Sequence, residues 1–461
     1  MQITKTDVIW NYSATFLKIA SSVLLFPLIL RALPAETVGI WSIFITITSF
    51  VGLFDFGFNP SFARNVTYVF SGVRNLKVKG FDSICEESPG IDYGLLRGVI
   101  TAMRWFYSRI AVVVFVLLIT LGTYYIHSLL QNYKGGHFEV YEAWGLLCII
   151  NTYNLYTLHY DSLLQGKGLI KRSKQIIIIG QTAYLIIASI LIMTGFGLVA
   201  IVSAQAASVI IVRFLSHRSF FTKWIKQALN KASSRPRQEI IQAIYPNALK
   251  VGLTSLGAFM VQKSAIVIGS LYLALEVIAS YSITIQLISI IGFLASIYTA
   301  TYQPKIVQLR VENNSHAIKE IYLRGQVFLI LTYVAGGTCL LFFGNSAIIF
   351  IGSKTQLMPQ LLIAAVIFAS FLECNLSTAG NILLSKNEVP FFKASLFAGA
   401  ATIVLLLCFF IFTNLKLWAM VLAPFIAQLY NDWKWPFEVI KQLNISIKDL
   451  FSTFINIIKI K

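Results

Sequence analysis

The sequence from Val8 to Leu30 reads VIWNYSATFLKIASSVLLFPLIL. A helix of this length crosses the ~30 Å hydrocarbon core of a bilayer. The run is too long for the apolar core of a signal peptide, and no small-residue cleavage site precedes the next apolar run near Val38, so we expect a retained span. Comparable runs recur as far as Trp435. Helices are expected in all of them because lipid offers backbone groups no hydrogen-bond partners.

Composition supports a membrane protein. The 461 residues are 57% hydrophobic and 12% charged, whereas a soluble domain carries roughly 25% charged residues. We therefore predict an all-α integral membrane protein with about twelve transmembrane helices. The expected spans are 8–30, 38–59, 109–131, 143–163, 175–195, 198–216, 248–271, 277–303, 325–344, 359–384, 391–413 and 417–435.

Charge distribution orients these spans. The chain has 37 Lys and Arg residues and a formal charge of +18. Most of the basic residues fall on the side of the N-terminus, and the opposite loops contain only Arg31, Lys134, Lys354 and Lys416. Basic loops resist translocation, which predicts that both termini are cytoplasmic. The basic residues are spread among short loops and form no single patch, so nucleic acid is not an expected partner.

A weak internal repeat predicts the domain organisation. A shift of 240 residues aligns Glu36 with Glu276, Ser42 with Ser282 and Ser49 with Ser289. We predict two six-helix lobes, 1–216 and 248–435, around a central cavity, although chance similarity between apolar segments is the alternative. A cytoplasmic insertion at about 71–92, an interfacial linker helix within 217–247 that packs into neither lobe, and a cytoplasmic tail at 436–461 complete the prediction.

Polar residues inside the spans mark the candidate site. A charge at mid-bilayer costs roughly 3 kcal/mol or more when it faces lipid, so such residues are expected to face a cavity or a partner. The candidate substrate-binding residues are Asn11, Thr15, Lys18, Ser42, Thr46, Arg64, Gln262, Lys263, Ser282 and Gln286. The candidate ion-coupling or gating residues are Asp55 and Glu373.

Several roles stay open. Lys18 either faces a cavity or belongs to a structural ion pair. Lys263 either faces a cavity or extends its side chain to the membrane interface. Glu373 is either a proton or sodium site or a counter-ion for one of these lysines. Asp55 is expected to pair with Arg64, as a gate or as a static brace.

Soluble catalytic chemistry is not indicated. Neither a phosphate-binding G-x-x-x-x-G-K-[ST] loop nor an H-E-x-x-H or G-x-S-x-G motif occurs. The five cysteines have no paired spacing that would specify a disulfide framework or a zinc site. We therefore expect no enzyme activity, no catalytic residue, no metal and no cofactor.

The N-terminal stretch resembles the polysaccharide-transport family of lipid-linked oligosaccharide flippases, often called O-antigen flippases. This family belongs to the superfamily that also holds the multidrug and toxin extruders. The residues that carry the resemblance are Asp7, Leu28-Ile29-Leu30-Arg31-Ala32-Leu33-Pro34, Gly39, Trp41, Leu53-Phe54-Asp55-Phe56-Gly57-Phe58 and Ala63-Arg64.

The resemblance implies a multi-pass protein of the bacterial inner membrane. Such a protein would translocate an undecaprenyl-diphosphate-linked O-antigen or capsule or exopolysaccharide unit by ion-coupled alternating access, with H⁺ or Na⁺ as the coupling ion. The implied partners are the polyprenyl-diphosphate-linked glycan, the lipid bilayer and a glycan polymerase. The implied cationic cavity would draw on Lys18, Lys263 and Arg64.

Two other functions are weighed. One is a multidrug or toxin extruder, but Lys263 stands where those proteins carry an acidic cation site in their seventh span. The other is a membrane glycan polymerase or glycosyltransferase, which needs catalytic groups in a substantial periplasmic loop. The expected periplasmic loops are all short.

Overall fold

The computed structural model describes residues 5–70, 72–74, 91–131, 133–311, 314–384 and 391–459. All regular secondary structure in these residues is helical. The chain divides into two compact units: the first comprises Met1–Thr37 and Ile43–Ser255, and the second Val38–Ser42 and Leu256–Lys461. Most of the insertion predicted at about 71–92 lies outside the described residues.

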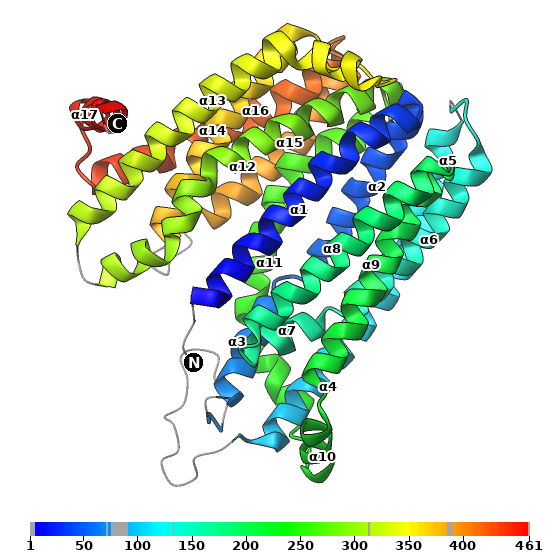
Figure 1. The fold of residues 1–461 in the computed structure, drawn as a ribbon, viewed down its shortest axis with the longest axis vertical. Coiled ribbons are helices and arrows are strands. Elements are labelled where there is room, and N and C mark those ends of the chain that lie inside the picture. Colours follow the sequence, from blue (N-terminus) through cyan, green and yellow to red (C-terminus); the bar gives the residue numbers. More distant parts are fainter. Residues whose placement is uncertain are drawn as a thin grey trace. The chain divides into compact units, whose positions relative to one another are not determined.

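The helices of the first unit overlap the predicted spans, with different bounds. They are α1 (Lys5–Ala32), α2 (Ala35–Leu53), α3 (Phe58–Phe70), α4 (Tyr93–Leu117), the π-helical turn η1 (Leu118–Gly122), α5 (Thr123–Leu130), α6 (His137–Tyr156), α7 (His159–Gly166), α8 (Ile170–Met193), α9 (Gly197–Phe220), α10 (Lys223–Lys231) and the first part of α11 (Arg237–Gly269). Helix α8 packs against both α1 and α9, as Figure 1 shows.

Two predicted spans of the first unit are interrupted. The span expected at 38–59 ends at Leu53, because Phe56 (φ 46°) and Gly57 (φ 71°) adopt left-handed backbone before α3 begins. The span expected at 143–163 divides into α6 and α7. There the Thr157 backbone leaves the helical region (φ −90°, ψ 3°), and both its hydroxyl and its N–H donate to the Tyr153 carbonyl, at 2.6 and 3.0 Å.

Six further helices and the rest of α11 build the described part of the second unit. They are α12 (Leu275–Val311), α13 (Ser315–Ile351), α14 (Gln360–Leu384), α15 (Phe392–Phe412), α16 (Leu417–Gln442) and α17 (Ile447–Lys459). Helix α14 packs on α12, α13 and α16, and α15 packs on α16. A Cβ atom on Gly399 would lie 2.9 Å from the Gly257 carbonyl oxygen, so small residues let α11 and α15 approach closely.

Length and composition support the membrane assignment. Eight helices of the described chain are long and apolar enough to cross a bilayer, and the predicted all-α membrane fold is confirmed. The eight are Ala35–Leu53, Tyr93–Leu130, Ile170–Met193, Gly197–Phe220, Leu275–Gln303, Ser315–Ile351, Gln360–Leu383 and Phe392–Phe412. Helix α16, which contributes several polar residues to the site below, is not among them.

The expected linker helix packs on a neighbour. Segment 217–229 is divided between the end of α9 and α10, and Ile225 of α10 is fully buried. Arg97 of α4 donates to the Ala232 carbonyl at 2.7 Å, and the rings of Tyr93 and Trp224 meet edge to face. The expectation that this helix packs into neither lobe is wrong, because its apolar face is covered by α4.

Candidate functional site

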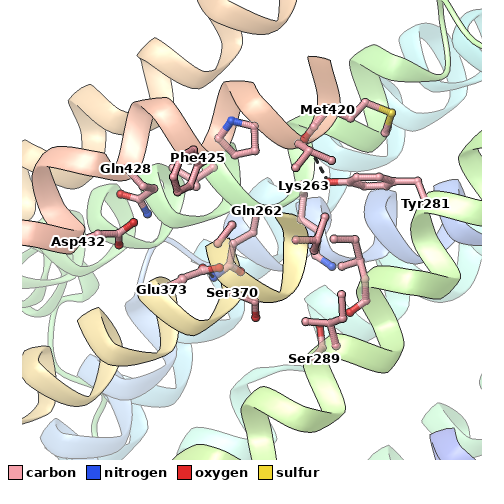
Figure 2. Close-up of a pocket in the computed structure, with 17 residues that line it drawn as sticks. Gln262, Lys263, Tyr281, Ser289, Ser370, Glu373, Met420, Phe425, Gln428 and Asp432 are labelled. Atoms are coloured by element: carbon pink, nitrogen blue, oxygen red, sulfur yellow. Dashed lines mark hydrogen bonds between the residues drawn. The ribbon is translucent and has the colours of Figure 1, made fainter. Parts of the chain in front are cut away.

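A polar cavity of about 210 Å³ lies within the second unit, among α11, α12, α14 and α16. Its lining residues are Val261, Gln262, Lys263, Tyr281, Ile285, Ile288, Ser289, Val366, Ala369, Ser370, Glu373, Met420, Val421, Pro424, Phe425, Gln428 and Asp432. Figure 2 shows that four different helices supply the polar side chains. A cavity that several helices of one unit enclose is suited to hold a small polar ligand away from lipid.

Glu373 of α14 is positioned by an amide from α11. The Gln262 side-chain nitrogen donates to a Glu373 carboxylate oxygen at 2.7 Å. Lys263, the next residue along α11, lines the same cavity and interacts electrostatically with Glu373. Ser370, one turn earlier on α14, shares a hydrogen bond of 2.8 Å with the Tyr333 hydroxyl. The Glu373 carboxylate is therefore held in place and retains acceptor capacity toward the cavity.

A second carboxylate enters from α16. Asp432 is 8% exposed, and its Oδ1 atom has no hydrogen-bond partner among the described residues. Gln428 lies one helical turn earlier and also lines the cavity (Figure 2). An unpartnered buried carboxylate oxygen is costly in a structure. Binding of a proton or a cation would remove that cost.

The ionisable lining of the cavity is one ammonium group and two carboxylates. With Lys263 protonated and both Glu373 and Asp432 ionised, these three groups carry one net negative charge. Opposite charges at this depth stabilise one another far more than they would in water. The cavity therefore suits one monovalent cation or proton better than it suits an anion.

Three solved structures resemble this chain in fold over nearly its whole length. A multidrug resistance MATE family transporter of the MOP superfamily, in an inward-facing conformation, superposes with a TM-score of 0.66 at 14% identity, covering 95% of this chain and 96% of that one. The lipid II flippase MurJ, in an inward closed conformation, gives 0.63 at 14% identity with 97% and 90% covered. A MOP superfamily transporter from Pyrococcus furiosus gives 0.54 at 13% identity with 97% and 100% covered.

This chain has the fold of the MOP superfamily transporters. The fold that the resemblance of the N-terminal residues implied is therefore confirmed. No family model and no curated protein matches the sequence significantly.

The MOP fold brings only some of the predicted site residues together. Gln262, Lys263 and Glu373 line one cavity. Ser282 and Gln286 lie on α12 but do not line it; Ser282 is buried and its hydroxyl has no partner among the described residues.

The remaining predicted residues lie in other places. Ser42 is buried and its hydroxyl donates to the Val38 carbonyl of its own helix at 2.9 Å. Thr46 is buried and Arg64 is exposed on α3. The side chains of Asn11, Thr15 and Lys18 lie outside the described residues, and their roles stay predictions.

Asp55 is held by partners other than the expected one. The Tyr107 hydroxyl donates to Asp55 Oδ1 at 2.6 Å, and the Asn59 backbone N–H donates to both carboxylate oxygens at 3.0 and 3.1 Å. Asp55 thus caps the start of α3. No ion pair joins it to Arg64 in the part of the chain that the structure describes, so the expected pairing is wrong. A gating role for Asp55 stays a prediction.

The sequence reasoning missed Gln428 and Asp432. Both fall inside the span predicted at 417–435, four residues apart, and so on one face of its helix. An aspartate inside a predicted span is itself a functional signal, because hydrocarbon rejects its charge. That signal was present and would have identified Asp432.

Proposed function

We propose that this protein is a flippase that moves an undecaprenyl-diphosphate-linked oligosaccharide across the bacterial inner membrane, from the cytoplasmic to the periplasmic leaflet. The prenyl chain of such a lipid is already soluble in hydrocarbon, whereas its diphosphate and sugars cannot cross ~30 Å of it unaided. The observation that carries the proposal is a cavity in which Lys263, Glu373 and Asp432 can hold a coupling ion, among four helices of a MOP transporter fold. The likeness in fold to a lipid II flippase supports it.

The cavity is proposed as the coupling-ion site. The cavity has two carboxylates and one ammonium group, and this net negative charge favours uptake of one H⁺ or Na⁺. Lys263 then serves as the counter-ion of Glu373, and the attraction of the diphosphate falls to Lys18 and Arg64. Binding of the cation in one conformation and its release in the other would bias alternating access, because a ligand shifts an equilibrium only by its differential affinity for the two states.

A reconstituted assay tests transport directly. The purified chain is placed in liposomes with a fluorescent diphosphoprenyl sugar, and the fraction of label accessible from outside is followed after imposing a proton or a sodium gradient. We expect the fraction of accessible label to change only when the protein is present and only under one of the two gradients. Equal accessibility with and without the protein would contradict the flippase proposal.

Variants of the cavity test the ion-coupling role. Glu373→Gln and Asp432→Asn are each expected to abolish the gradient dependence of transport, because they remove a charge that binds the cation. Glu438→Gln, which changes an exposed carboxylate on the same helix as Asp432, is the matched control and is expected to behave as wild type. If transport by both cavity variants still depends on the gradient, the coupling ion does not bind in this cavity. The flippase proposal itself would not be contradicted by that result.

A second candidate is export of an organic cation. The net negative cavity and the fold shared with a multidrug resistance transporter favour it, whereas the ammonium group of Lys263 inside the cavity opposes it. Efflux of a fluorescent cationic dye from cells expressing the chain, compared with cells expressing Asp432→Asn, decides between the two substrates. Dye efflux that the variant abolishes, without transport of the prenyl lipid, would support the extruder.

A further inference from the structure

A second cavity opens between α15 and α16 of the second unit. It has a volume of about 460 Å³ and is lined by Lys393, Ala394, Phe397, Ala398, Ala401, Ala427, Tyr430, Asn431, Lys434 and Trp435. The residues from α15 recur at intervals of three or four, and so do those from α16, which places each set along one helix face. The cavity is therefore a groove that follows both helices. None of its residues lines the cavity proposed for the coupling ion.

The groove is cationic at one end and apolar along its length. Both ionisable lining residues are lysines, Lys393 at the beginning of α15 and Lys434 toward the end of α16. Four alanines and Phe397 line the groove away from the lysines, and the small alanines leave space between the helices. From Lys393 to Ala401 the groove extends over eight residues, or ~12 Å at the helical rise.

Aromatic side chains hold the ammonium group of Lys434. The nitrogen donates to the Tyr430 hydroxyl at 2.6 Å and lies 4.8 Å from the centroid of the Trp435 ring. Trp435 is itself fixed by its hydrogen bond of 3.1 Å to Asn431. An ammonium group has three donors. Lys434 therefore keeps N–H groups for an anion beside the groove.

The surface around the groove is suited to lipid and not to water. Phe397 is 75% exposed and Trp433 is 76% exposed, with Tyr430 at 59%. Tyr and Trp are enriched where a span meets the headgroup region. An occupant must therefore combine an anionic head with an alkyl chain, which is the chemistry of an acidic phospholipid. Basic pockets between spans bind such headgroups.

We propose that the groove between α15 and α16 binds an anionic phospholipid, with its phosphate between Lys393 and Lys434 and an acyl chain along the alanine-lined length. If both termini are cytoplasmic, as the charge distribution predicts, this lipid belongs to the inner leaflet. The site does not depend on the proposed flippase function, because it lies on other residues and takes a lipid that need not be transported.

Native mass spectrometry of the purified full chain tests the proposal. Binding of phosphatidylglycerol is compared with binding of phosphatidylcholine carrying the same acyl chains. Each lysine near an anionic lipid contributes about 1 kcal/mol, or about fivefold in affinity. Lys393→Gln and Lys434→Gln are each expected to weaken phosphatidylglycerol binding by about that factor, and to leave phosphatidylcholine binding unchanged. Lys441→Gln, an exposed lysine further along α16, is the matched control and is expected to match wild type.

A size change tests the groove separately from its charge. Ala427→Phe fills the space between the helices and is expected to weaken binding of both lipids, with both lysines intact. Equal binding of the two lipids to wild type, or losses in the lysine variants no larger than in Lys441→Gln, would overturn the proposal. So would displacement of phosphatidylglycerol by an equimolar amount of undecaprenyl phosphate, because the groove would then be a prenyl-lipid site.

Discussion

The pair formed by Arg213 and Asp161 allows the sharpest stability prediction. An Arg213 guanidinium nitrogen lies 2.8 Å from Asp161 Oδ1, and a second donates to Asn154 at 2.6 Å. The Arg213 side chain is 6% exposed and that of Asp161 is 28% exposed. The two partners therefore differ in access to water. Removing Asp161 leaves a buried cation, whereas removing Arg213 leaves a carboxylate that water still reaches.

The two single variants should therefore lower the free energy of unfolding by different amounts. Asp161→Ala is expected to lower the free energy of unfolding by about 3 kcal/mol, the lower end of the range for breaking a buried pair. Arg213→Met is expected to lower it by about 1.5 kcal/mol, the value of a hydrogen bond to a charged group. The double variant should be more stable than Asp161→Ala alone, because it contains no unpaired buried charge.

Equilibrium unfolding in mixed micelles, with SDS as denaturant and circular dichroism as readout, measures these differences. Arg218→Met, which changes an exposed arginine on the same helix, is the control and is expected to stay within about 0.5 kcal/mol of wild type. A double variant less stable than Asp161→Ala, or a cost for Arg213→Met equal to or above that of Asp161→Ala, would refute this account of the burial asymmetry.

Two further predictions concern packing and pH. Gly166→Ala would place a Cβ atom 2.4 Å from the Cβ atom of Val66 and is expected to lower the free energy of unfolding by about 1–3 kcal/mol, because it overpacks this contact. At Gly145 an added Cβ meets no atom within 4 Å, so Gly145→Ala is the control and should be neutral or stabilising in the same unfolding assay. At the start of α17, the hydrogen bond from Lys319 lowers the pKa of Asp449 from 3.8 to about 2. A carboxylate whose pKa is lowered by folding stabilises the folded state at pH values above its pKa in the unfolded chain, and this stabilisation is lost as the pH falls to its folded pKa. Hydrogen-exchange protection of α17 should therefore be full above about pH 4 and decrease toward pH 2. In Asp449→Asn the protection should no longer depend on pH in this range.

The sequence determined the all-α membrane class, because crossing hydrocarbon requires about twenty apolar residues in a row and leaves only the helix to satisfy the backbone. Of the twelve spans predicted, eight helices of the described chain are long and apolar enough to cross. It also pointed to Gln262, Lys263 and Glu373, because hydrocarbon rejects such groups wherever the helices pack. The three line one cavity, and their functional roles stay predictions. The interruptions at Gly57 and Thr157 were not predicted, because each depends on the backbone conformation of one or two residues within an otherwise apolar run.

Only the tertiary structure decided which polar residues share a cavity. On α12 the lining residues are Tyr281, Ile285, Ile288 and Ser289, whereas the predicted Ser282 and Gln286 do not line the cavity although Ser289 continues their helix face. A hydroxyl inside a span can also satisfy itself, as Ser42 does on its own backbone, and then needs no cavity. Asp432 and Glu373 line the same cavity because α16 packs on α14, a contact between helices that neither segment specifies alone.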